Sequence, residues 1–487
     1  MISGWQGFCE TVAARPDAPA LLIGARAFNL ADLGRMARQM ASGLDQRGVA
    51  AGDRVILHLP NGPEAAVLPA ALWALGAIPV LAPLDLRPEA LADIATRTAA
   101  KAVVAAGQTS LDLPVPRWPA ATLLAATERT LGDRNGGIGS IVFTSGSTGR
   151  PKGVVQLQST LMAGAARVAE AVGFGPSDRL LSAVPWSHDY GWTQLLALYR
   201  LGVTLVLPEV AGLAGLPEAI ERHRATVLGG VPSVYAGLTR GISDIASRNR
   251  SSVRLIMSTG SPMPVRIWDD LAGLFPQARR CLNYGLTETF RSATLRATDE
   301  ALAPGIVGTA LPGSALVVVD DDDRPLPAGH WGQIVHCGAG VFEGYWDDPG
   351  QTLLRRRVDP VTGQGFAVFT GDRGMLDAAG RLTVGDRIDR MVKVMGMSAS
   401  PLAIEAVLRA VPGVEAAAVV FCPHDILGAE LHAFVVGGDL KLVEAACRSA
   451  LATHERPRRF HQSAALPLTA SGKFDLVELT RQIAGGA

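Results

Sequence analysis

Cysteine is scarce in this chain of 487 residues, and neither sign of charge is in excess. The five cysteines are odd in number, lie far apart and form no C-x-x-C pair, which argues against a disulfide framework and against a zinc site. The 45 basic and 45 acidic side chains leave no net charge, which argues against nucleic-acid binding and against an electrostatic membrane anchor. We therefore expect a protein of the reducing cytoplasm whose partners are small molecules.

Long uninterrupted apolar segments are also lacking. Residues 65–84 form a stretch of the length of a membrane span, but Pro69, Pro79 and Pro83 break it. This punctuation predicts a buried helix followed by a buried strand, and no membrane span. The N-terminal region carries Glu10 and lacks a basic segment followed by a long apolar one, so we expect no secretory signal.

Short apolar runs alternate with alanine-rich amphipathic stretches, which indicates an α/β architecture with buried, largely parallel strands. The chain is longer than the size at which a single core stops growing, so at least two domains are expected. We expect a large N-terminal domain that contains two α/β subdomains. Strands are predicted over 54–59, 101–106, 203–207 and 254–257, and helices over 31–47 and 159–172.

From about residue 305, glycine-rich turns and hairpin-like strands predict a β-rich subdomain that closes the large domain. The aspartate run 320–323 is interpreted as a solvated turn between two strands, and the arginine run 355–357 as a solvated face. The remaining hundred or so residues suffice for a small α+β domain. Its strands are predicted over 390–395, 414–421 and 431–436, and its helices over 401–410 and 440–452, before a terminal loop and helix.

Residues 141–153, IVFTSGSTGRPKG, place a hydroxyl-rich and glycine-rich loop after an apolar strand. Glycines let backbone N–H groups approach phosphate oxygens, while hydroxyls and Lys152 add donors and positive charge. The segment is not the P-loop of common nucleotide triphosphatases, because Pro151 stands at their second glycine and Gly153 at their Mg²⁺-binding hydroxyl. The loop predicts a polyphosphate site in a different nucleotide-using fold.

This loop resembles the phosphate-binding signature of the adenylate-forming (AMP-binding) superfamily. The superfamily contains acyl- and aryl-CoA synthetases, fatty acyl-AMP ligases, amino-acid adenylation domains and luciferases. Further segments are similar to its motifs in the same order, so the resemblance covers nearly the whole chain. These segments are 185–191 (PWSHDYG), 258–262 (STGSP), 284–288 (YGLTE), 340–346 (GVFEGYW), 370–372 (TGD), 386–393 (DRIDRMVK) and 467–473 (PLTASGK).

The resemblance implies an AMP-binding adenylation core over 1–386 and a mobile C-terminal lid domain over 387–487, with a hinge near Asp389. It implies an ATP-dependent, AMP-forming acid–thiol ligase of the acyl-CoA synthetase type. Such an enzyme adenylates a carboxylic acid, releases pyrophosphate and passes the acyl group to a thiol. The implied cofactors are ATP and Mg²⁺, and the implied acceptor is CoA or a phosphopantetheinyl carrier protein.

Each half of the nucleotide is assigned to residues by the same resemblance. The loop would hold the β- and γ-phosphates, Thr287 the α-phosphate and Glu288 the Mg²⁺ ion, so that negative charges are compensated. The loop residues concerned are Thr144, Ser145, Gly146, Ser147, Thr148, Gly149 and Lys152. Gly260 and Ser261 would line the adenine pocket. Tyr284 would stack on the base, with Gly285 beside it. Asp372, assisted by Arg387, would bind the ribose hydroxyls.

The resemblance makes Lys473 the catalytic lysine that reaches between the substrate carboxylate and the α-phosphate. The C-terminal domain would then rotate about Asp389 and admit a thiol past residues 393–398. One site would run both half-reactions.

His188 and Asp189, with Gly285, are the candidate substrate-binding residues. We set aside a hydrolase dyad, because adjacent side chains rarely point at each other. His188 matches a position that gates the acyl pocket. Asp189 matches the aspartate that holds the α-ammonium group in amino-acid adenylation domains, but fatty acyl-AMP ligases also carry His-Asp here. Because a buried carboxylate needs a partner, a stand-alone amino-acid adenylating ligase that loads a carrier protein remains an alternative.

Some positions depart from the family pattern. Met397 and Ser398 replace the aromatic and basic residues common in CoA synthetases. Because phosphate-binding charge is missing there, free CoA is less favoured as the thiol acceptor, and a phosphopantetheinyl carrier protein is an alternative acceptor. Asp386 replaces the usual glycine before Arg387.

Luciferase-like oxidation has no support beyond the shared scaffold. A regulatory protein without turnover is disfavoured, because it would not need all four charges of Lys152, Glu288, Asp372 and Lys473.

Overall fold

The structure is a computed structural model that describes residues 2–107, 113–125, 137–144, 151–210, 212–240, 243–297, 305–395, 397–424, 427–469 and 474–484. The chain folds into two compact units. The first unit comprises Met1–Val317 and Val335–Phe369, and the second comprises Val318–Ile334 and Thr370–Ala487. This confirms the expected large N-terminal and small C-terminal parts. The boundary at 386/387 stays a prediction.

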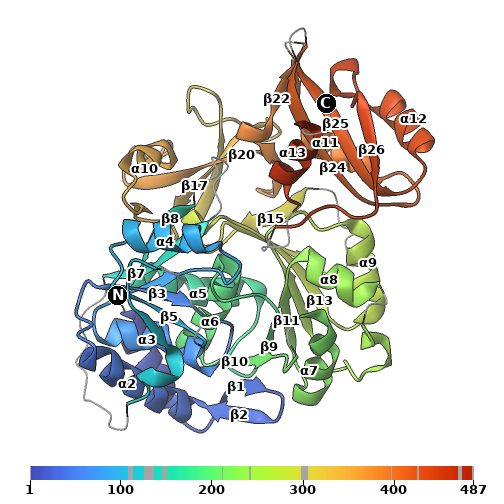
Figure 1. Ribbon diagram of the computed structural model, residues 1–487. Helices are drawn as coiled ribbons and strands as arrows, with labels where there is room; N and C mark the ends of the chain where they lie inside the picture. Colours follow the sequence, from blue (N-terminus) through green and yellow to red (C-terminus); the bar gives the residue numbers. More distant parts are fainter. Residues whose placement is uncertain are drawn as a thin grey trace. The chain divides into compact units, whose positions relative to one another are not determined.

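The first unit is built around two sheets with helices between and outside them (Figure 1). In one sheet the strand order is β2-β1-β10-β9-β11-β12-β13-β14-β15. The six neighbouring strands β1, β10, β9, β11, β12 and β13 are parallel. Their bounds are β1 Pro19–Ile23, β2 Arg26–Asn29, β9 Arg179–Ser182, β10 Thr204–Leu207, β11 Val227–Gly230, β12 Leu255–Ser258, β13 Arg279–Tyr284, β14 Ala293–Ala297 and β15 Ile306–Ala310.

The other sheet has the order β18-β8-β7-β4-β3-β5-β6, with β8 antiparallel to both β18 and β7. Its bounds are β3 Arg54–His58, β4 Ile78–Leu81, β5 Ala102–Ala105, β6 Arg117–Pro119, β7 Ile138–Thr144, β8 Lys152–Leu157 and β18 Gly344–Tyr345. The strands predicted from apolar runs are confirmed in both sheets. The helices of the unit are α1 Gly4–Ala14, α2 Leu30–Gln46, α3 Pro63–Ala74, α4 Pro88–Arg97, α5 Gln158–Val172, α6 Asp189–Leu201, α7 Leu216–His223, α8 Pro232–Thr239, α9 Val265–Leu274 and α10 Pro349–Arg355.

The apolar core explains this layering. One buried cluster joins α1, α2, α3, α5 and α6 to strands of both sheets, so these helices lie between the sheets. At its centre the rings of Trp73, Trp192 and Tyr199 make edge contacts with centroids 5.7 to 6.4 Å apart. A second cluster packs α7, α8 and α9 on the outer face of the first sheet, and a third packs α4 on the second. Strands covered on both faces are continuous apolar runs in the sequence, which is why they could be predicted.

The apolar stretch 65–84 folds as predicted, as the buried helix α3 followed by the buried strand β4. Among the residues that the structure describes, no helix is both long and apolar enough to cross a bilayer.

The predicted β-rich region is confirmed. Its strands are β16 Ser314–Val319, β17 Gly332–Gly338, β19 Arg356–Val358, β20 Phe366–Leu376 and β21 Leu382–Arg387, and β16, β17 and β20 contribute residues to both units. The aspartate run forms the predicted turn, in which Asp320 Oδ1 accepts hydrogen bonds from the backbone N–H groups of Asp322 and Arg324.

The interpretation of Arg355 to Arg357 as a solvated face is wrong. Arg355 and Arg356 donate to the carbonyl oxygens of Phe369 and Phe342, at 3.1 and 2.9 Å. The guanidinium carbon of Arg357 lies 3.3 Å from the centroid of the Phe369 ring. Backbone carbonyls and aromatic faces, which are distant in sequence, therefore hold these side chains at half-buried positions.

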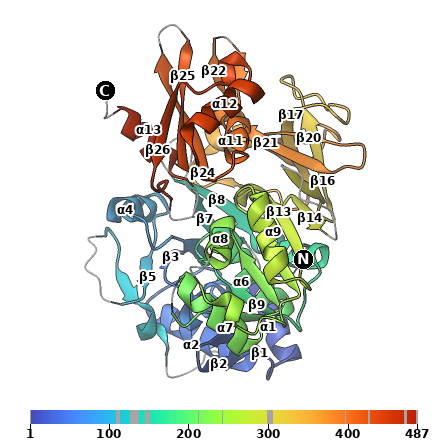
Figure 2. The ribbon, with the colours of Figure 1, turned by 90° about the vertical axis from the view of Figure 1, so that its right-hand side faces the viewer.

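The second unit contains a three-stranded sheet with helices on both faces (Figure 2). Alternating residues of β24 face opposite sides: Ala417 and Val419 pack with α11 and α12, whereas Ala418 and Val420 pack with α13. The bounds are β22 Val392–Val394, β23 Met397–Ala399, α11 Pro401–Arg409, β24 Val414–His424, β25 Gly428–Gly437, α12 Leu440–Ala450, β26 Arg459–Ser463 and α13 Leu476–Ala484. The sequence did not predict β26, because Phe460 is its single apolar residue.

Candidate functional site

Glu288, Tyr345 and Lys152 meet in one corner of the first unit. Tyr345 donates a 2.6 Å hydrogen bond to Glu288 Oε1. The ammonium nitrogen of Lys152 lies 5.5 Å from the Tyr345 ring centroid and donates a 2.6 Å hydrogen bond to Gln351 Oε1. A carboxylate and a lysine from distant segments thus share one tyrosine, and the three side chains are held in a fixed arrangement.

Strand pairing brings these residues together. Thr144 ends β7 and Lys152 begins β8, and the two are partners in the antiparallel ladder. Tyr345 lies on β18, which pairs with β8 so that Tyr345 is opposite Val154. The predicted loop residues Ser145, Gly146, Ser147, Thr148 and Gly149 lie outside the described residues.

A buried glutamine ties the same hairpin to the YGLTE segment. Gln156, fully buried on β8, donates a 2.7 Å hydrogen bond to the carbonyl oxygen of Thr287. Thr287 is buried and begins the 3₁₀ turn Thr287–Thr289 that carries Glu288. The position of Glu288 relative to β8 is therefore set by the hydrogen bond from the Gln156 side chain to the Thr287 carbonyl as well as by Tyr345.

The chain after Glu288 contains a strained turn. Phe290 has φ 60° and ψ −59°, and the N–H of Arg291 donates a 2.7 Å hydrogen bond to the carbonyl oxygen of Thr289. This is a γ-turn with positive φ, a rare and strained conformation. The Phe290 ring is fully buried, and its nearest carbon would lie 2.6 Å from a Cβ placed on Gly164. Packing of Phe290 therefore holds the turn, which directs the chain back beside Gly285.

Gly285 is required by this close approach. A Cβ at position 285 would meet the Arg291 Cα at 2.9 Å and the Ser292 nitrogen at 3.1 Å. Tyr284, the last residue of β13, is half-buried beside it. Gly260, at φ 91°, and Ser261 are exposed after the end of β12, the neighbouring parallel strand. The carboxyl ends of these strands are where ligands bind in α/β sheets.

His188 and Asp189 stand at the start of α6, with His188 at the N-cap position. Asp189 Oδ1 is buried and has no hydrogen-bond partner among the described residues. Burial raises the pKa of the Asp189 carboxyl to about 6, while the Arg291 charge opposes this shift and the Glu288 charge adds to it. Asp189, Glu288 and Arg291 therefore form one electrostatic neighbourhood.

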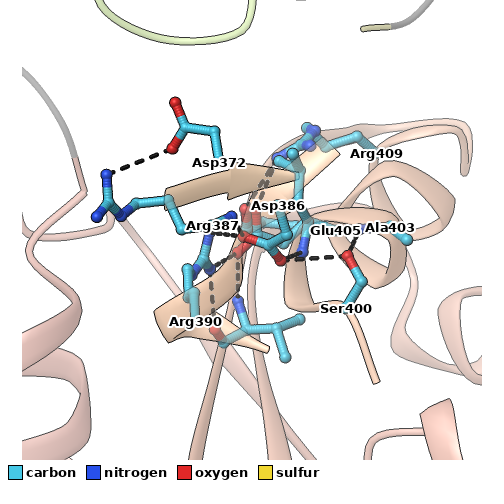
Figure 3. Close-up of polar contacts among 11 residues, drawn as sticks. Asp372, Asp386, Arg387, Arg390, Ser400, Ala403, Glu405 and Arg409 are labelled. Atoms are coloured by element: carbon cyan, nitrogen blue, oxygen red, sulfur yellow. Dashed lines mark hydrogen bonds and ion pairs between the residues drawn. The ribbon is translucent and has the colours of Figure 1, made fainter. Parts of the chain in front are cut away.

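In the second unit, Asp372 and Arg387 lie opposite each other on the paired strands β20 and β21. Arg387 Nη1 lies 3.3 Å from Asp372 Oδ1 (Figure 3). The Asp372 side chain is 11% exposed. The pair that the resemblance assigned to the ribose is thus formed within one hairpin.

Asp386 accepts hydrogen bonds from three groups (Figure 3). Its carboxylate accepts from the N–H of Leu402 at 2.7 Å, the hydroxyl of Ser400 at 3.2 Å and the N–H of Arg387 at 3.0 Å. Because Leu402 is in the first turn of α11, Asp386 acts as an additional cap that joins β21 to that helix. The aspartate therefore has a structural role that glycine could not fill.

An ion-pair network continues from this cap. Arg390 Nη1 lies 3.8 Å from Asp386 Oδ1, and Arg390 Nη2 lies 2.5 Å from Glu405 Oε1. Arg409 Nη1 lies 3.6 Å from Glu405 Oε2. Glu405 is 4% exposed and also accepts from the N–H of Val419. The backbone at Asp389 forms the 3₁₀ turn Ile388–Arg390 within this network, whereas the catalytic-lysine candidate Lys473 lies outside the described residues.

The sequence assigned no role to Tyr345, Gln156 or Arg291. Tyr345 lies within the GVFEGYW segment, so its motif was recognised but its contact with Glu288 was not. Arg291 is 3% exposed, and its position three residues after Glu288 is the signal that could have drawn attention to it.

The donor set suits Mg²⁺ bound together with a nucleotide. Among the described residues there is no cluster of three or more metal-ligating side chains. Mg²⁺ usually takes one or two protein carboxylates and completes its shell with water and substrate phosphates. Glu288 supplies one such carboxylate beside the β7–β8 hairpin, which fits this mode and does not fit an all-protein metal cage.

Known proteins resemble this chain over nearly its whole length. A family model for AMP-binding enzymes matches residues 8–346, and a model for the AMP-binding enzyme C-terminal domain matches residues 403–473. A feruloyl-CoA synthase from Amycolatopsis sp is 31% identical over 494 residues, which cover 96% of each chain. CymA of Salinispora arenicola, a probable nonribosomal peptide synthetase, is 30% identical over 96% of this chain, but the match spans 6% of that much longer protein. The crystal structure of ATP-bound MatB from Rhodopseudomonas palustris superposes with a TM-score of 0.86 at 25% identity over 99% of both chains.

Proposed function

Because the chain belongs to the AMP-binding enzyme family and is an ATP-dependent, AMP-forming acid–thiol ligase, we propose that the corner formed by Lys152, Glu288 and Tyr345 receives the triphosphate of ATP. The observation that carries this proposal is the hydrogen bond from Tyr345 to Glu288 beside the Lys152 ammonium group. A cation for phosphate oxygens and a carboxylate for their counterion lie side by side.

The phosphates have further donors nearby. Thr144 and Lys152 flank the glycine- and hydroxyl-rich loop 145–150, whose residues would contact the β- and γ-phosphates. Thr287 would bond the α-phosphate, since it precedes Glu288 in the same turn. Glu288 would hold Mg²⁺, which when bound would neutralise charge on the departing pyrophosphate.

Residues of the second unit would complete the reaction. Asp372, oriented by Arg387, would accept hydrogen bonds from the ribose hydroxyls. Lys473 would stabilise the negative charge that develops as the acid attacks the α-phosphorus. Rotation about a hinge at Asp389 would follow adenylation and expose the site to the thiol.

The acid is expected beside His188 and Asp189. A specific observation also favours the second candidate function, an amino-acid adenylating ligase: the buried Oδ1 of Asp189 has no hydrogen-bond partner within the described residues. A substrate ammonium group would supply that partner and restore the ionised form of Asp189. Without such a group, the carboxyl would remain partly protonated near pH 6.

The thiol acceptor would be a phosphopantetheinyl carrier protein in preference to free CoA. The hairpin β22–β23 carries two exposed methionines, Met395 at 53% and Met397 at 47% exposure, and a single basic residue, Lys393. Exposed methionines suit a protein surface, whereas the phosphates of CoA call for several positive charges.

ATP–pyrophosphate exchange tests these proposals. Fatty, aryl and amino acids would each be offered with Mg²⁺, and the accepted acid would show exchange that depends on both. Product analysis with CoA or with a pantetheinylated carrier protein would then identify the acceptor. If no acid supports exchange, the assignment of the corner to ATP is wrong.

A further inference from the structure

A small, partly open cavity lies next to the expected position of the acid. Its volume is about 20 Å³, and its polar wall includes Tyr190, Thr193, Asn283 and Arg291. Apolar side chains such as Phe174 and Leu180 complete the lining. Tyr190 follows Asp189 in the chain, and the Arg291 guanidinium carbon lies 5.3 Å from the Tyr190 ring centroid. The cavity is therefore lined by the neighbour of a candidate substrate-binding residue.

Two of the lining residues each have a buried polar atom without a partner. Arg291 Nε and Asn283 Oδ1 are buried and make no hydrogen bond within the described part of the chain. Arg291 is 3% exposed and Asn283 is 7% exposed. Leaving a buried donor and a buried acceptor unsatisfied is energetically costly, so a ligand group that pairs with both would be bound selectively.

The rest of the polar wall is already satisfied. The hydroxyls of Tyr190 and Thr193 donate to the carbonyl oxygens of Met257 and Tyr190. Gln194, which also lines the cavity, accepts from the Ser182 hydroxyl and donates to the carbonyl oxygen of Gly229. Arg291 Nη1 donates a 2.8 Å hydrogen bond to the Thr259 hydroxyl, which fixes the guanidinium and leaves Nε available. The cavity therefore offers one donor and one acceptor, and its volume corresponds to about one water molecule.

We infer that this cavity receives a hydroxyl group at the end of the acid remote from its reacting carboxylate, and that Arg291 determines this specificity. This inference rests on the proposed function. The Arg291 Nε–H would donate to the hydroxyl oxygen, and the hydroxyl proton would go to Asn283 Oδ1. A hydroxyl is the smallest group that does both, whereas a carboxylate is larger and only accepts. A methyl group of similar size would leave both wall atoms unpaired.

Matched pairs of acids test this inference in ATP–pyrophosphate exchange with the full-length enzyme. The pairs are 4-hydroxycinnamate and cinnamate, 4-hydroxybutyrate and butyrate, L-tyrosine and L-phenylalanine, and L-homoserine and L-2-aminobutyrate. For the accepted pair, the hydroxy acid should have a kcat/KM about tenfold or more above that of its partner. Equal values for the two members would overturn the inference while leaving the proposed function intact. Absence of exchange with every acid would overturn both.

Two variants locate the effect. Arg291→Met should bring the hydroxy-to-deoxy ratio toward one, while Arg296→Met, an exposed arginine on β14, should keep it. Asn283→Leu provides a second test if Arg291→Met fails to fold. Calorimetry with the acyl-sulfamoyl adenosines of the accepted pair gives a readout other than turnover. Tighter binding of the hydroxy compound by the wild type and not by the variants supports the inference. If both variants keep the wild-type preference for the hydroxy compound, the inference is refuted.

Discussion

Tyr345 donates a 2.6 Å hydrogen bond to Oε1 of Glu288, a residue 57 positions earlier in the chain. The same ring packs edge-on against Phe342, with centroids 5.1 Å apart, and faces the Lys152 ammonium group. One side chain thus fixes the candidate Mg²⁺ ligand relative to the candidate phosphate-binding lysine. Such positioning matters because phosphoryl chemistry depends mainly on orientation and charge compensation.

Tyr345→Phe should reduce exchange activity about tenfold and increase the Mg²⁺ concentration needed for half-maximal rate. The phenylalanine keeps the ring and its contacts, but Glu288 loses the donor that orients it. The melting temperature should change little, because a single hydrogen bond contributes about 1 kcal/mol. Trp331→Phe, at an exposed aromatic residue, is the matched control. An unaltered Mg²⁺ dependence in Tyr345→Phe would contradict the positioning role.

The layered core was predictable from sequence because buried parallel strands are continuous apolar runs. The corner at Glu288 was predictable as a set of motifs, but not as a set of contacts. Tyr345 and Gln156 act through partners more than 50 residues away, and no local pattern reveals such partners. The arginines at 355–357 were misinterpreted for the same reason, since their acceptors are carbonyl oxygens of other segments.

Asp386→Ala should lower the stability of the second unit by about 2 to 3 kcal/mol, since it removes three hydrogen bonds and leaves Arg390 beside a weakened network. Urea unfolding followed by circular dichroism measures the change. Asp439→Ala is a matched control, because Asp439 is an exposed N-cap with one hydrogen bond to the α12 backbone, and its loss should cost about 1 kcal/mol. Equal costs for both variants would rule out the additional role of Asp386 as a link between β21 and α11.

Lys473→Ala should lower adenylate formation about 100-fold or more while ATP binding is retained, because the lysine is proposed to act on the transition state. Exchange kinetics measure the first effect, and fluorescence titration with ATP measures the second. Lys441→Ala, at an exposed position of the same unit, should behave as wild type. Full exchange activity in Lys473→Ala would refute the assigned role.

Asp189→Asn should raise thermal stability more at pH 8 than at pH 5. Burial raises the pKa of Asp189 to about 6, above the ordinary value of 3.8 that it regains on unfolding. The folded state therefore binds the proton more tightly, and stability is lost as the pH rises from about 4 through 6, by at most about 3 kcal/mol. Asparagine mimics the protonated carboxyl and removes this loss. Melting temperatures of the wild type, Asp189→Asn and the exposed-site control Glu170→Gln at both pH values measure the effect.

A bound ammonium group would favour the ionised carboxylate of Asp189. Saturation with an amino-acid substrate should therefore cancel the stability advantage of Asp189→Asn at pH 8, whereas a simple carboxylic acid should preserve it. An equal gain at both pH values in the free protein would mean that Asp189 is already ionised at pH 5.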